Sequence, residues 1–96
     1  MEQIERITYM EQILDEATEA VSSLSEALEK YAAIQDKLQE LAAYYSSEQW
    51  RKDFDDDSAG KIPSDLKRGV LSEDAVYNLL ADITDLKEQL KKLAIQ

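Results

Sequence analysis

The sequence has 96 residues and a formal net charge of −10, and it contains neither cysteine nor histidine. Without cysteine there is no disulfide framework or thiol nucleophile, and without histidine the usual general base near neutral pH is missing. Nucleic acids and anionic membranes select clustered Lys and Arg, so the acidic balance argues against both as partners. The acidic start and the short apolar runs predict a cytoplasmic protein without a signal peptide or membrane span.

All the glycine and proline of the chain lies in one window, at Gly60, Pro63 and Gly69. These residues interrupt regular structure, so their confinement predicts long helices on both sides and an all-α fold. We expect a single domain over residues 1–96, made of four segments: a helix at about 3–45, a short helix at about 47–57, a connector at 58–71 and a helix at about 73–94.

Apolar side chains recur at three positions of each heptad through residues 3–45. A stripe of this width is typical of a bundle helix. The last helix also keeps apolar residues at coiled-coil spacing, so we expect the two long helices to pack antiparallel in a small bundle. A bend at Ser22 and Ser23, which would fold the first half back, is the alternative.

The last helix is about half as long as the first, at 1.5 Å per residue. It can therefore cover only part of the stripe, and the N-terminal part would face water in a monomer. Exposed apolar strips of this size are rare on soluble monomers. The sequence thus predicts a homodimer whose interaction residues are Ile7, Met10, Ile13, Leu14, Ala17 and Val21.

Ser46 and Gln49 fit a capping box for the short helix, in which Trp50 and Phe54 would share one face. Most aromatic residues crowd this third of the chain: Tyr44, Tyr45, Trp50, Phe54 and Tyr77. Two interpretations stay open. The rings plug the end of the bundle, which helical spacing favours, or they form a partner-binding hot spot.

The connector carries its own signals. Ser64 to Gly69 resembles one helical turn that ends in a glycine with positive φ. Ser72 is the expected N-cap of the last helix, with Leu71 and Val76 at the positions of a hydrophobic staple. The residues expected to shape this region are Trp50, Gly60, Pro63, Gly69 and Ser72.

An acidic cluster precedes the connector, and its candidate ligands for a divalent cation are Asp53, Asp55 and Asp57. An EF-hand frame that starts at Asp55 places Ala59 and Leu66 at positions that must ligate. We therefore expect no metal and no other cofactor. Nearby basic residues are expected to balance the cluster: Lys61, Lys67 and Arg68.

The segment over residues 44–80 resembles a bacterial family known as domain of unknown function 4298. The resemblance rests on Trp50-Arg51-Lys52-Asp53-Phe54, on Gly60-Lys61-Ile62-Pro63, and most specifically on Lys67-Arg68-Gly69-Val70-Leu71-Ser72-Glu73-Asp74. The flanking helices are similar too, so it covers nearly the whole chain. It implies a small helical bacterial protein and carries no activity or catalytic residue.

Paired carboxylates abound, but none has an adjacent base or nucleophile in the sequence, so we expect no enzyme. The leading hypothesis is a helical interaction module that associates with itself, with room for an unidentified protein partner. One alternative is a divalent-cation-binding protein that uses the region Asp53–Asp57. Another is an acidic decoy that binds a basic protein through the long helix.

Overall fold

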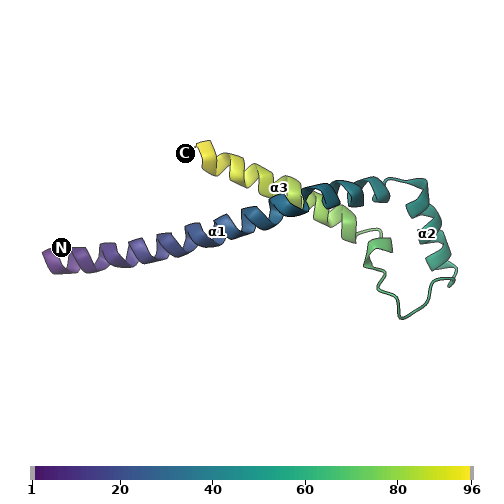
Figure 1. Cartoon of the computed structure of the whole chain (residues 1–96), viewed down its shortest axis with the longest axis horizontal. Helices are drawn as coiled ribbons and strands as arrows, with labels where there is room; N and C mark the ends of the chain where they lie inside the picture. The colour runs from purple at the N-terminus through teal and green to yellow at the C-terminus, as the bar shows by residue number, and fades with distance from the viewer. Residues whose placement is uncertain (1, 96) are drawn as a thin grey trace. The chain divides into compact units, whose positions relative to one another are not determined.

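A computed structural model of the chain describes residues 2–95. It contains α1 (Gln3–Tyr45), α2 (Glu48–Ser58), the 3-10 turn η1 (Gly69–Leu71) and α3 (Ala75–Ile95), shown in Figure 1. No strand occurs among these residues. The expected all-α class, with a long N-terminal helix followed by shorter ones, is confirmed.

The chain divides into two compact units, Met1–Lys37 and Leu38–Gln96, here called the N-terminal and the C-terminal unit. Within its described residues, the N-terminal unit is almost entirely the first part of α1. The helix runs unbroken through Ser22 and Ser23, as Figure 1 shows. The chain therefore does not bend there, and the apolar stripe stays on one continuous helix.

The C-terminal unit contains the end of α1 together with α2, the connector and α3. Its core is small and consists of Trp50, Leu71 and Val76, which are 8%, 7% and 3% exposed. These residues come from α2, η1 and α3 respectively. The connector thus contributes directly to the core and brings α2 and α3 together around it.

Ser47 joins α1 to α2. Its hydroxyl donates to the carbonyl of Tyr44 at 2.5 Å and accepts from the backbone N–H of Trp50 at 3.2 Å. One side chain therefore binds a carbonyl at the end of one helix and satisfies an orphan N–H at the start of the next. The expected capping box at Ser46 is wrong by one residue, because Ser47 is the N-cap of α2.

Gly60 ends α2 with a φ of 76°. The Gly60 N–H donates to the Asp57 carbonyl at 3.0 Å, and the Lys61 N–H donates to the Asp56 carbonyl at 2.9 Å. This hydrogen-bond pair defines a Schellman motif, in which glycine is favoured at the left-handed position.

The prediction of a positive φ at Gly69 is wrong, since Gly60 is the glycine with positive φ among the described residues. Gly69 instead begins η1, and a Cβ added there would meet open space. The turn near Ser64 is also shorter than expected, with a hydrogen bond from the N–H of Leu66 to the carbonyl of Pro63 at 3.2 Å.

The entry to α3 follows the predicted chemistry, with a shift of the boundary. The Ser72 hydroxyl accepts from the N–H of Ala75 at 3.0 Å, while the first α-helical residue is Ala75 itself. Leu71 and Val76, the expected staple pair, are two of the three buried apolar residues. The serine cap and the apolar pair together fix how the chain enters α3.

Candidate functional site

The N-terminal part of the apolar stripe of α1 is exposed, whereas several positions between Tyr31 and Tyr45 are half-buried. Over its whole length α1 contains no buried residue. Leu14 and Val21 are 57% and 67% exposed, and Ile13 is 41% exposed. Ile7 and Met10 are likewise exposed, and so is Ala17. All six predicted interaction residues are therefore accessible on one helix.

The aromatic residues of the C-terminal unit form a cluster around Trp50. The indole stacks on Phe54, with ring centroids 5.1 Å apart and an interplanar angle of 21°. Tyr45 meets the same indole edge-on, at 5.2 Å and 72°. The indole Nε1–H donates to the carbonyl of Val70 at 2.9 Å, which links α2 to the connector. Trp50 and Phe54 do share a face of α2, as their spacing of four predicts.

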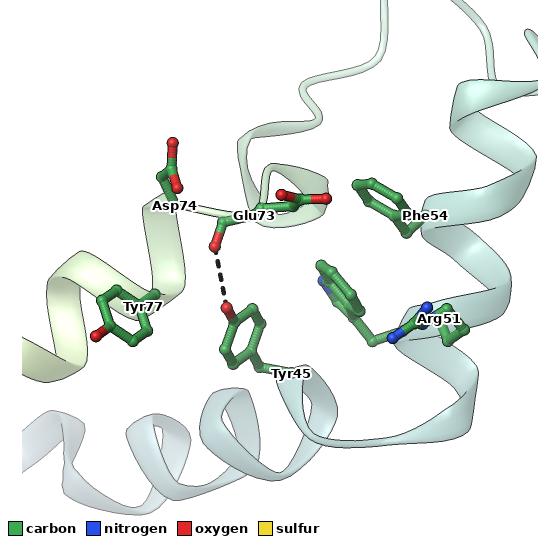
Figure 2. A pocket seen from close by; sticks show the side chains of 7 residues that line it. Tyr45, Arg51, Phe54, Glu73, Asp74 and Tyr77 are labelled. Carbon is green, nitrogen blue, oxygen red and sulfur yellow. Dashed lines mark hydrogen bonds between the residues drawn. The ribbon is translucent and has the colours of Figure 1, made fainter.

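A pocket of about 440 Å³ opens beside this cluster. Its aromatic lining consists of Tyr45, Trp50, Phe54 and Tyr77, and its charged lining of Arg51, Glu73 and Asp74. Figure 2 shows the Tyr45 hydroxyl reaching the backbone carbonyl of Glu73, a bond of 3.0 Å. In the same view the Glu73 side chain points toward Phe54. Trp50 is buried within this group of rings, while Tyr77 is 64% exposed at the rim of the pocket.

A hydrogen bond outside the pocket ties α1 to α2. The Tyr44 hydroxyl donates to Oδ2 of Asp53 at 2.6 Å. This bond, together with desolvation and the charge of Asp53, raises the pKa of Tyr44 from 10.0 to about 12. Each of these three effects disfavours the ionised form of Tyr44, a phenolate that would lie next to the Asp53 carboxylate. Tyr44 therefore stays neutral and acts as a structural donor, and its position excludes it from the pocket lining.

The three carboxylates considered for a cation do not converge. Asp53 accepts from Tyr44, and Asp57 pairs with Arg68. Residues two apart on a helix point to different faces, so Asp55 is directed away from both. Within residues 2–95, no three acidic side chains are grouped so that they could hold a metal ion. Two of the three basic connector residues pair with the cluster, Arg68 with Asp57 and Lys61 with Asp56 at 4.0 Å.

Sequence reasoning missed two parts of the pocket. Arg51 and the pair Glu73 and Asp74 lie in segments that carry the family resemblance, but nothing in the sequence placed them together, and the pocket joins them across more than 20 positions. The bond from Tyr45 to the Glu73 carbonyl spans 28 positions. The one available hint was the crowding of aromatic residues around these positions.

Among the described helices, none combines the length and the apolar character that a membrane span requires. The chain matches no curated protein and no solved structure. Residues 7–93 match the family described as Domain of unknown function (DUF4298). Because this match covers nearly the whole chain, including α2, the connector and the pocket, the protein belongs to that family.

Proposed function

We propose that the protein is a non-enzymatic helical module that associates with itself through the N-terminal part of α1. The observation that carries this proposal is the exposed stripe on a helix without a single buried residue. An isolated helix in water is marginally stable and gains most from tertiary packing. Covering the stripe would therefore stabilise the helix as well as remove apolar surface from water.

The length of the exposed face supports a dimer. The stripe exposes side chains at successive turns from Ile7 to Val21, and the same face continues through Leu24 and Leu28. A specific interface needs to bury about 1,000 Å² or more in total, so a dimer would have to pack along most of this face. An antiparallel arrangement about a two-fold axis covers both stripes with the same residues. A stripe three positions wide is broader than a two-position coiled-coil seam, so this contact would resemble helix packing in a bundle.

The test is the solution mass of the full chain by light scattering at micromolar concentration. We expect a dimer for the native sequence and a monomer for Leu14→Glu, because the variant places an unpaired charge in the buried seam. Gln12→Glu is the matched control: it adds the same charge in the same turn, on the opposite face of the heptad. It should remain dimeric.

The salt dependence of association distinguishes this proposal from the alternative in which the acidic helix captures a basic protein. Residues 1–45 carry ten acidic and three basic side chains. Screening weakens repulsion between two such helices, so self-association should persist or strengthen as salt is added. A monomeric mass with full helicity would contradict the proposal, and so would equal dissociation by Leu14→Glu and Gln12→Glu.

A further inference from the structure

We propose that the pocket beside Trp50 binds the basic side chain of a partner polypeptide, with arginine preferred over lysine. This site lies in the C-terminal unit and is independent of the α1 stripe. Its lining contains aromatic rings, and it contains two carboxylates that form no ion pair within residues 2–95. Both the rings and the carboxylates attract a cation.

The aromatic side of the pocket is held in place before any ligand arrives. Trp50 is 8% exposed and is fixed by the hydrogen bond to Val70 and by its stacking on Phe54. Tyr45 is fixed by its edge contact with the indole and by its bond to the Glu73 carbonyl. Rings that are already ordered lose little conformational entropy on binding, which favours affinity.

These rings carry negative charge density on their faces and attract cations placed above them. Trp50 itself is covered by Phe54 and Tyr45, so the ring surface that a ligand can reach belongs mainly to Tyr45, Phe54 and Tyr77. A planar guanidinium can also stack on a ring while its N–H groups point outward to acceptors. The ammonium of lysine is not planar and has no fixed fork of donors, so it cannot stack flat on a ring in this way, which is the reason for the expected preference.

The acidic side of the pocket supplies those acceptors. Among residues 2–95, the ion pairs are Lys61 with Asp56 and Arg68 with Asp57. Glu73 and Asp74 are thus exposed and free of a basic partner, and Figure 2 shows the Glu73 side chain directed toward Phe54. Two carboxylates outweigh the single guanidinium of Arg51 in the lining.

Arg51 favours a polypeptide as the source of the cation. A free ammonium ion would meet only repulsion from its guanidinium, whereas a peptide offers backbone carbonyls that the guanidinium can bind. The pocket is also open to the surface at Tyr77, which is 64% exposed, so a side chain carried on a folded or extended partner can enter. The net charge of −10 attracts basic partners at longer range.

Trp50 is the only tryptophan of the chain, so its fluorescence reports on the pocket directly. The probes are three capped pentapeptides, glycine except for a central arginine, lysine or citrulline, and tetramethylammonium chloride. We expect a saturable change with the arginine peptide at millimolar concentration or below, a weaker response to lysine, and none to citrulline or the free cation. Added salt should weaken the binding.

Two kinds of variant test the assignment. Glu73→Gln with Asp74→Asn should weaken arginine-peptide binding about tenfold or more, the scale of a lost charge-assisted hydrogen bond. Tyr77→Leu should weaken it without affecting the buried core. Asp82→Asn with Glu88→Gln, which removes two exposed charges elsewhere on α3, should bind like the native chain. Circular dichroism confirms that each variant is folded.

Leu14→Glu should bind the arginine peptide as well as the native chain does, so failure of self-association leaves this site intact. The proposal is overturned if no arginine response occurs, or if citrulline or tetramethylammonium binds as strongly. It is also overturned if lysine binds more tightly than arginine, or if the pocket variants and the α3 control lose binding equally.

Discussion

In the C-terminal unit a tryptophan, a leucine and a valine are each more than nine-tenths buried, whereas α1 has no buried residue along its 43 positions. Both regions are rich in apolar side chains, and both are helical. They differ in connectivity. The connector returns Val70 and Leu71 to Trp50, while the N-terminal unit is one straight segment with nothing that folds back within it.

This difference shows how a short chain divides its apolar surface. A turn-rich connector allows residues 20 positions apart to enclose a small core. A long helix without Gly or Pro cannot enclose anything by itself, so its stripe is available to another molecule. The C-terminal unit should therefore respond to core substitutions as a folded domain does, and the N-terminal unit should respond through association.

The largest effect is expected from Trp50→Ala. The substitution removes the most extensive buried side chain and leaves the Val70 carbonyl without its donor. Such changes cost about 3–5 kcal/mol, a large part of the stability of a small domain. Chemical denaturation followed by circular dichroism measures it. Ile4→Ala, at a residue 76% exposed on α1, is the control and should change little. If both variants lost the same free energy of unfolding, the C-terminal unit would not be the more tightly packed of the two.

A second, smaller effect separates the two glycines. Gly60 has a φ of 76°, so Gly60→Val forces a branched residue into the left-handed region at a cost of about 1–3 kcal/mol. Gly69→Val should cost well under 1 kcal/mol, because Gly69 lacks that backbone conformation and a Cβ there meets open space. Denaturant midpoints of the two variants provide the comparison. A reversed order would mean that the Schellman motif at the end of α2 is misassigned.

The smallest effect concerns pH. The bond to Asp53 raises the pKa of Tyr44 above its ordinary value of 10.0, to about 12. A raised pKa in the folded state gives stability that is complete below pH 10 and lost as pH rises through about 12. Tyr44→Phe should therefore be less stable than the native chain near neutral pH, and the difference should shrink across that interval. A gap for Tyr44→Phe that stays constant across this interval would contradict the assignment.

Local sequence signals determined the helices and most of their ends. The confinement of Gly and Pro to residues 60–69 placed the connector, because backbone breakers act within a few positions. The heptad pattern identified the α1 stripe for the same reason, since side chains three and four apart always share a helix face. The shared helix face of Trp50 and Phe54 and the hydrogen bond that Ser72 accepts at the start of α3 are also local and were predictable.

Where two residues suited the same structural role, only the three-dimensional structure showed which of them takes it. Ser46 and Ser47 are both serines and both could cap the helix, but it is Ser47 that binds the Tyr44 carbonyl and the Trp50 N–H. Gly60 and Gly69 both suit a left-handed position, and the helix that actually ends in a Schellman motif selects Gly60. Asp53 and Asp57 are engaged by Tyr44 and Arg68, which sequence spacing does not reveal. The pocket depends on Tyr45 meeting Glu73 across 28 positions, because contacts between distant segments follow from packing rather than from local preference.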